Sequence, residues 1–137
     1  MSEDLKFRQL PGHYAVVRFA ADAPTPEWAG NGSFFSITRT QDELSVVSPV
    51  ENIPPDVNAD PRWICLKLEG PFPFSQTGVL LSFIEPLSNS GVPIFAISTY
   101  DTDYVFIQQG HESRALGLLR EAGHELIADE PWQTKAL

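Results

Sequence analysis

The sequence is poor in cysteine and in positive charge, and it has no long hydrophobic run. Cys65 is the single cysteine, so no disulfide framework exists, and a lone cysteine in an apolar stretch is usually a buried small hydrophobic side chain. Nine Lys and Arg stand against eighteen Asp and Glu, a net charge of −9. A surface of that sign repels phosphate, so we expect no nucleic-acid or anionic-membrane binding. No apolar run approaches the roughly 18 residues that a membrane span needs.

The sequence also lacks the motifs of common catalytic and cofactor sites. It has no glycine-rich nucleotide motif and no GxSxG nucleophile motif. His13, His111 and His124 are too far apart to pair as metal ligands on one helix or hairpin, and we expect them at the surface or in caps. Asp101 and Asp103 are not followed by the further acids and glycine of a calcium loop. We therefore expect no metal, no cofactor and no enzymatic activity. The N-terminus does not resemble a signal peptide, which predicts a cytoplasmic protein.

The first half of the chain favours short strands separated by proline and glycine. Apolar and β-branched residues predict strands over Tyr14–Phe19, Ser33–Arg39 and Leu44–Val47. Between the first two strands, Ala20–Gly32 has room for little more than one helical turn. Ser48–Arg62 contains four prolines, which remove amide donors and interrupt helix and sheet alike, so we interpret it as a connector.

The second half has a clearer pattern. We predict, in order, a strand Trp63–Leu68, a helix 76–89, strands Val92–Ser98 and Tyr104–Gln108, a helix 112–122 and a strand His124–Ala128. Strand, helix, strand, strand, helix, strand is the ferredoxin-like order, βαββαβ. The predicted fold class is therefore α+β, an antiparallel sheet with helices on one face. We divide the chain into a degenerate first repeat with the proline-rich connector, residues 1–61, and a complete repeat, residues 62–137.

A polar cluster interrupts the apolar strands of the second half. The stretch ISTYDTDYVFI, residues 97–107, carries two carboxylates at its centre. Asp101 and Asp103 could form a catalytic acid pair, a metal site, a plain turn or half of a binding site. Asp is favoured in turns because it bonds its own backbone, and no partner base is evident nearby, so catalysis has the least support.

The loop before the helix 76–89 is a second candidate segment. Ser75 could cap the helix, and Gly78 in its first turn leaves the backbone unobstructed, so the first amides of the helix could bind a carboxylate. The ferredoxin-like order brings this loop to the same edge of the sheet as Asp103 and the carbonyls near Thr99 and Tyr100, which suit an ammonium. The residues fit equally well a structural interpretation in which they only cap, pack and turn.

The run from Trp63 to Ile127 resembles an ACT domain, a small amino-acid-sensing regulatory module. The resemblance is carried by LEGPFPFSQTGVLLSFIEPLSNSGVPIFAISTYDTDYVFI, and DELSVVSP in the first half resembles the preceding repeat of short tandem-ACT bacterial proteins. The same arrangement recurs in the animal cytosolic arginine sensors. The resemblance implies two ferredoxin-like ACT repeats, of which the first is degenerate.

The resemblance also implies where a ligand would bind. The implied ligand-binding residues are Gln76, Gly78, Val79, Ile94, Thr99, Tyr100 and Asp103. Ile94 and its neighbour Pro93 lie on the strand edge that faces the adjacent module in paired ACT domains, so the ligand would sit at a seam and a homodimer would create it. Gln76 is uncharged where the arginine-sensing relatives have an acidic residue, so arginine is not implied.

Together these observations predict a cytoplasmic, non-enzymatic sensor. It would bind an amino acid or similar small zwitterion between ACT modules, form a homodimer and act on an effector protein that the sequence does not identify. The alternative is an interaction or dimerisation module that retains no ligand pocket. A third interpretation, a small enzyme that uses Asp101 or Asp103, predicts turnover in addition to binding.

Overall fold

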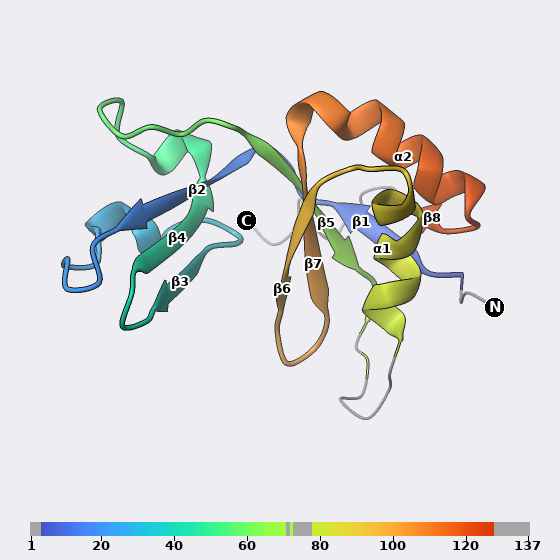
Figure 1. The fold of residues 1–137 in the computed structure, drawn as a ribbon, viewed down its shortest axis with the longest axis horizontal. Coiled ribbons are helices and arrows are strands. Elements are labelled where there is room, and N and C mark those ends of the chain that lie inside the picture. The colour runs from blue at the N-terminus through green and yellow to red at the C-terminus, as the bar shows by residue number, and fades with distance from the viewer. Residues whose placement is uncertain (1–3, 71, 73–77, 128–137) are drawn as a thin grey trace, which may run out of the picture. The chain divides into compact units, whose positions relative to one another are not determined.

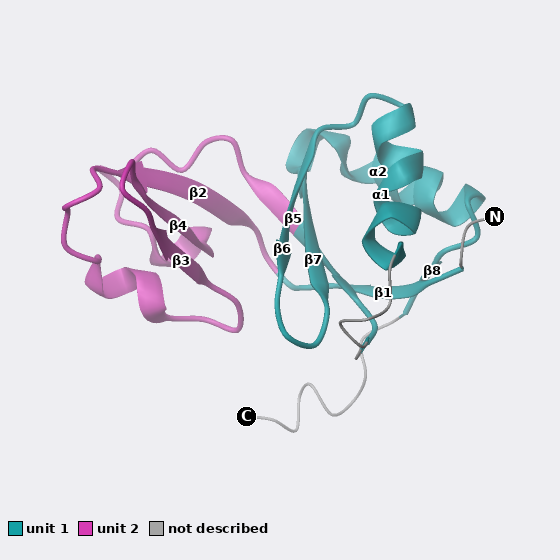
Figure 2. Ribbon diagram, turned by 60° about the horizontal axis from the view of Figure 1, so that its bottom comes forward, with its two compact units in different colours: residues 1–11, 65–137 teal, residues 12–64 magenta. Residues whose placement is uncertain are grey.

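The computed structural model describes residues 4–70, 72 and 78–127, and the chain forms two compact units. Unit 1 combines residues 1–11 with residues 65–137, and unit 2 consists of residues 12–64 (Figure 2). The N-terminal segment therefore belongs with the second half of the chain and not with the residues that directly follow it. The division into sequence repeats at residue 61 stays a prediction, because the contacts define units and not repeats.

Unit 2 is a small sheet with short helices beside it (Figure 1). Its elements are β2 (Tyr14–Phe19), η1 (Glu27–Gly30), β3 (Ser36–Arg39), β4 (Leu44–Pro49) and η2 (Val50–Asn52). Strand β4 pairs antiparallel with both β2 and β3. The helical turn expected between the first two strands is the 3-10 helix η1, whose Trp28 packs against Phe19 with ring centroids 6.2 Å apart. Small apolar residues such as Ala15, Val17 and Val46 fill the core beneath it.

Unit 1 contains the predicted strand and helix order. Its elements are β1 (Lys6–Gln9), β5 (Trp63–Leu68, which begins in unit 2), α1 (Val79–Asn89), β6 (Ile94–Ser98), β7 (Asp103–Gln108), η3 (Gln109–His111), α2 (Glu112–Glu121) and β8 (Glu125–Leu126). Strand β7 pairs with β5 and β6, and the two α-helices lie side by side over one face of the sheet (Figure 2). The α+β, ferredoxin-like fold class is confirmed.

Strand β1 is the element that the sequence did not reveal. It pairs antiparallel with β5 and parallel with β8, so it lies between them in the sheet. The expectation of a purely antiparallel sheet is therefore wrong in this part of unit 1. A strand of four residues with one inward apolar side chain, Phe7, gives almost no periodicity to detect.

The core of unit 1 fixes β1 against the helices. Phe7 is 1% exposed and meets the Phe83 ring of α1 edge to face, with centroids 5.1 Å apart. His124, expected at the surface or in a cap, is instead buried. Its Nδ1 accepts the Leu5 N–H at 3.0 Å, which leaves the proton of the neutral ring on Nε2, 3.1 Å from the Ser82 carbonyl oxygen. One imidazole thus joins the start of β1 to the second turn of α1.

Cys65 is fully buried in β5, as the sequence predicts. Burial raises the pKa of its thiol, because a thiolate would be removed from water without compensation.

In the described part of the chain, no helix is both long enough and apolar enough to cross a membrane.

We expect Phe7→Ala to destabilise the protein by about 3–5 kcal/mol, because it leaves a cavity between β1 and α1. The matched control is Phe35→Ala, since that ring is 42% exposed, and its cost should stay below about 1 kcal/mol. Urea unfolding of both variants measures the difference. Equal costs would show that β1 is not integral to the unit.

We expect the Cys65 thiol of the native protein to be inert to a thiol reagent such as DTNB at mildly alkaline pH. The reactive thiolate is suppressed by the raised pKa, and the sulfur is also inaccessible. The same protein in concentrated guanidinium chloride should release one equivalent of chromophore. Rapid reaction of the folded protein would contradict the buried position of this side chain.

Candidate functional site

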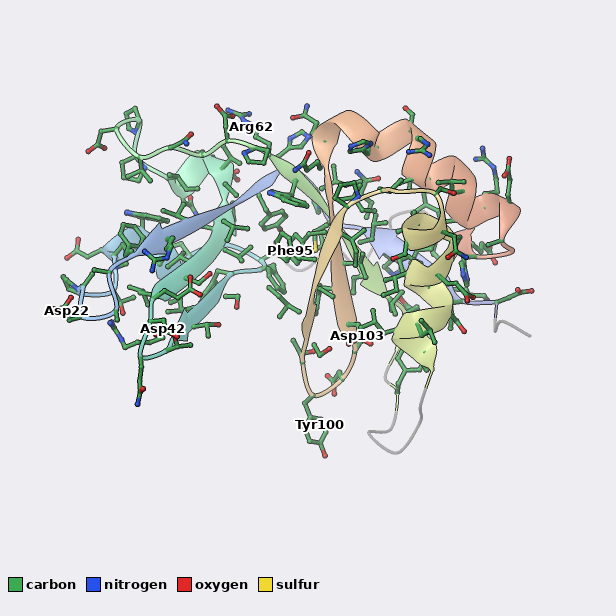
Figure 3. All side chains as sticks on the ribbon, in the orientation of Figure 1. Asp22, Asp42, Arg62, Phe95, Tyr100 and Asp103 are labelled. Carbon is green, nitrogen blue, oxygen red and sulfur yellow. The ribbon has the colours of Figure 1, made fainter. Side chains whose placement is uncertain are left out.

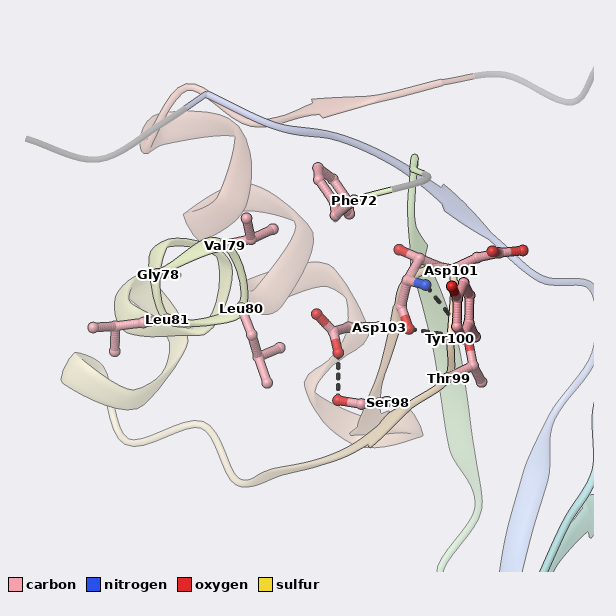
Figure 4. A pocket seen from close by; sticks show the side chains of 11 residues that line it. Phe72, Gly78, Val79, Leu80, Leu81, Ser98, Thr99, Tyr100, Asp101 and Asp103 are labelled. Carbon is pink, nitrogen blue, oxygen red and sulfur yellow. Dashed lines mark hydrogen bonds between the residues drawn. The ribbon is translucent and has the colours of Figure 1, made fainter. Parts of the chain in front are cut away.

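A cavity of ≈ 360 Å³ lies in unit 1 between the start of α1 and the turn that joins β6 to β7 (Figure 4). The α1 side contributes Gly78, Val79 and Leu80, and the turn contributes Thr99, Tyr100 and Asp103. Phe72, in the segment that leads from β5 toward α1, completes an apolar wall. A larger cavity, ≈ 480 Å³, is lined by residues 50–62 of unit 2, within the proline-rich connector.

The first turn of α1 lines the cavity and begins at a glycine. The N-cap position is Gly78, with φ of +82°, and no side chain among the described residues caps the helix. Ser75 was expected to be the cap; it lies outside the described residues, and α1 begins after it at Val79. The left-handed conformation explains the glycine, since other residues adopt it at a cost. The first hydrogen bond of the helix runs from the Ser82 N–H to the Gly78 carbonyl at 2.9 Å, so the three preceding amides have no carbonyl partner in the helix.

The turn between β6 and β7 is tied to its surroundings by hydrogen bonds. The Thr99 N–H donates to the Thr102 carbonyl at 2.8 Å, which closes the turn. The Thr102 side chain is 6% exposed, and its hydroxyl donates to the Leu68 carbonyl at 2.8 Å, which anchors the turn to β5.

The same turn also holds the start of the loop that precedes α1. The Phe72 N–H donates to the Asp101 carbonyl at 2.9 Å. The backbone of Gly70 passes so close to the turn that a Cβ there would lie 2.9 Å from the Asp101 carbonyl oxygen. A glycine is needed at that position because the contact is with backbone, which cannot move aside cheaply. Loop and turn are therefore one connected wall of the cavity.

The two carboxylates of the turn point in different directions. Asp103 lies opposite Ser98 in the β6–β7 register, accepts a hydrogen bond from the Ser98 hydroxyl and is directed toward α1 (Figure 4). The Asp101 carboxylate is exposed and directed away from α1. Asp101 also lines a cavity of ≈ 180 Å³ together with Lys67. The pKa of Tyr104 is raised, first by burial and then by the nearby Cys65 and Asp101 side chains.

The structure brings most of the predicted site residues together. Gly78, Val79, Thr99, Tyr100 and Asp103 all line the cavity, and Tyr100 is 78% exposed at the tip of the hairpin (Figure 3). Their roles in ligand binding stay predictions.

Of the other two predicted residues, one is absent from the cavity lining and one lies outside the described residues. Ile94 begins β6, pairs with Ile107 and is absent from the cavity lining. Gln76 lies outside the described residues. Sequence reasoning missed Ser98 and the anchoring role of Thr102. The pairing of Ser98 with Asp103 follows from the hairpin register once the turn is known.

Among the described residues, no group of three or more His, Cys, Asp and Glu could hold a metal ion.

Comparison with protein families agrees with this architecture. The ACT domain family matches residues 58–121, and a family described as an N-terminal domain matches residues 12–56. The crystal structure of protein Atu0741 from Agobacterium tumefaciens is 43% identical, with 94% of this chain and 96% of that chain covered and a TM-score of 0.87. Residues 58–121 thus form a domain of the ACT family, whose members are regulatory, amino-acid-binding modules.

More distant proteins extend the similarity. Putative protein CASTOR3P from Homo sapiens is 29% identical over 87 residues, covering 54% of this chain and 53% of that protein, so the chain spans about half of its length. VC0802 from Vibrio cholerae, titled a possible transport protein, is 17% identical with a TM-score of 0.69 and coverages of 82% and 85%. Clostridium acetobutylicum aspartate kinase, titled an allosteric enzyme, is 13% identical with a TM-score of 0.54, covering 85% of this chain and 33% of the kinase. At these low identities, the last two similarities show that the fold is shared and nothing about function.

We expect Thr102→Val to destabilise the protein by about 1–3 kcal/mol, because the buried Leu68 carbonyl loses its hydroxyl donor while the side-chain shape is kept. Thr38→Val, on an exposed position of β3, is the matched control and should change stability by less than about 0.5 kcal/mol. Denaturant unfolding compares the two. A Thr102→Val protein as stable as the control would rule out the anchoring role of this hydroxyl.

Proposed function

We propose that this protein is a non-enzymatic sensor that binds an amino acid or a similar small zwitterion in the cavity between α1 and the β6–β7 turn. The observation that carries the proposal is that the first turn of α1, whose first amides have no carbonyl partner within the helix, and the Asp103 carboxylate line one cavity. The first group suits a carboxylate, because helix N-terminal amides carry partial positive charge. The Asp103 carboxylate suits an ammonium. An α-amino acid carries a carboxylate and an ammonium a few ångströms apart, so it needs both kinds of partner close together.

The size and construction of the cavity support this ligand class. Its volume of ≈ 360 Å³ lies in the range of roughly 300–1,000 Å³ that small-molecule sites occupy. Asp103 is half-buried and is oriented by the Ser98 hydroxyl, so its carboxylate is already positioned before a ligand arrives. Charge-assisted hydrogen bonds from both walls would fix the ligand backbone, as expected of a regulatory ACT module.

We further propose that a second copy of the chain covers the cavity. Leu81 is 61% exposed and Tyr100 is 78% exposed at its rim. In a two-fold dimer, the β6 edge that begins at Ile94 would face the loop of the partner copy, which accounts for a ligand-binding role of Ile94 without a place in the cavity of its own chain. The ligand would then favour one dimer geometry, and an effector protein would respond to that geometry.

The competing function is a pure interaction module, in which the same dimer forms and no ligand binds. The two functions differ in one measurable property, the dependence of stability on free amino acids. A ligand at 100 times its dissociation constant adds about 2.7 kcal/mol to the folded state, whereas an interaction module is indifferent to it.

We expect at least one of the standard amino acids, at millimolar concentration, to raise the melting temperature of the purified protein. Asp103→Asn should weaken that ligand by roughly 10- to 150-fold, because a hydrogen bond to a charged group is worth about 1.5–3 kcal/mol. Asp22→Asn, at an exposed position of unit 2, is the matched control and should bind as the unaltered protein does.

Two results would count against the proposal in different ways. No response to any amino acid would leave the interaction module as the function. A clear response that Asp103→Asn leaves unchanged would keep the sensor and move its site elsewhere. Sedimentation of the protein with and without the responding ligand tests the dimer separately.

A further inference from the structure

The sequence between the first and last segments that line the cavity has very few charges. Between residues 70 and 100 the sequence contains one charged residue, Glu85. This stretch includes the connection from β5 to α1 apart from its first residue, Glu69, and the residues of that connection outside the described ranges have no charged side chain in the sequence. Among the described lining residues there is no Lys, Arg or His, and the acidic residues are Asp101 and Asp103. Any ligand therefore meets very few ionic partners.

One of these two carboxylates is directed away from the cavity. Figure 4 shows Asp103 pointing toward Leu80, while the Asp101 carboxylate points away from α1. Asp101 also borders the ≈ 180 Å³ cavity that Lys67 and Glu69 line. The ionic side chains thus gather on the far side of the turn. The space next to α1 keeps a single carboxylate, together with the partial positive charge of the helix N-terminus.

The described wall on the α1 side is apolar, whereas the turn side carries the hydroxyls of Ser98, Thr99 and Thr102. Val79 and Leu80 lie on the first turn of α1, and Phe72 faces them across the cavity (Figure 4). Leu80 is half-buried and is directed toward the space in front of Asp103. A group that enters between these three side chains exchanges water for hydrocarbon, which is favourable for an apolar group and unfavourable for an ion without a partner.

We propose that the ligand is an amino acid with an uncharged, apolar side chain, such as the branched-chain amino acids or methionine. This inference rests on the proposed function. The α-carboxylate and α-ammonium of the ligand use the helix amides and Asp103, which are the complementary charges that the wall offers. An acidic side chain would add a charge of the same sign as Asp103, and a basic one would find no second carboxylate facing it. The apolar wall is then left for an apolar side chain.

The inference is tested on the full chain with ligand pairs that share a shape and differ in charge. Isothermal titration compares leucine with aspartate, methionine with glutamate, and norleucine with lysine. We expect the apolar member of each pair to bind at least about tenfold more tightly, because burial of a side chain of this size contributes that factor or more. These comparisons need no variant, so they do not depend on how a substitution folds.

A pair of variants then tests which wall of the cavity contacts the side chain of the ligand. Leu80→Ala should weaken methionine by about tenfold and leave alanine nearly unchanged, since alanine does not reach that wall. Leu126→Ala, an exposed leucine of β8 outside the cavity lining, is the matched control and should alter neither affinity.

The outcomes separate this inference from the proposed function. If lysine, aspartate or glutamate binds as tightly as its apolar counterpart, the inference is overturned while the sensor function stands. The same holds if Leu80→Ala weakens alanine and methionine equally. If none of the amino acids binds, the proposed function fails, and the inference fails with it.

Discussion

The position of β1 between β5 and β8 is the constraint on which the rest of unit 1 depends. Neither neighbour pairs with the other; each forms its ladder with β1. The Glu69 N–H donates to the Lys6 carbonyl at 2.8 Å, and the Arg8 guanidinium contacts the Glu69 carboxylate at 2.9 Å. These contacts with β1 therefore fix the position of Glu69, where the chain leaves β5 and begins the loop that leads to α1. The Leu5 N–H also donates to His124, whose Nε2 lies at hydrogen-bond distance from the Ser82 carbonyl oxygen of α1. The N-terminal segment therefore also fixes the position of α1, whose first turn lines the cavity.

Backbone contacts hold the described walls of the cavity in place. Gly78 turns the chain into α1, Gly70 allows the loop to touch the turn, and the Thr102 hydroxyl holds the turn to β5. Backbone amides and carbonyls cannot change rotamer, so a site built from them is already organised and loses little entropy when it binds. The polar side chains of Ser98 and Asp103 are positioned by their register across the hairpin. A rigid polar end and an apolar wall are what a small zwitterion with a hydrophobic side chain requires.

Sequence reasoning recovered the elements with strong periodicity and missed those held by distant contacts. The strands and helices of the second half follow from their apolar spacing, and both polar segments were singled out because they interrupt it. Strand β1 is too short to show a period, and its pairing with β8 joins residues more than a hundred positions apart. His124 was misjudged because its burial depends on Leu5 and Ser82, which no local pattern connects. Gly78 was expected in the first helical turn, but its left-handed conformation places it at the N-cap, and conformation is not visible in composition.

The inferred ligand also constrains how a response can be transmitted. An amino acid with an uncharged side chain has no net charge, so it leaves the long-range field of a protein of charge −9 unchanged. It therefore cannot act as a phosphate group does, by attracting or repelling a partner at a distance. What it changes is local: new hydrogen bonds between α1 and the turn, and apolar contacts at Leu80 and Phe72. Such contacts act over a few ångströms, and among the described residues Leu81 and Tyr100 are exposed side chains at the rim. The surface that reports ligand binding should consequently include this rim, where a second copy and its ligand would be in contact at once.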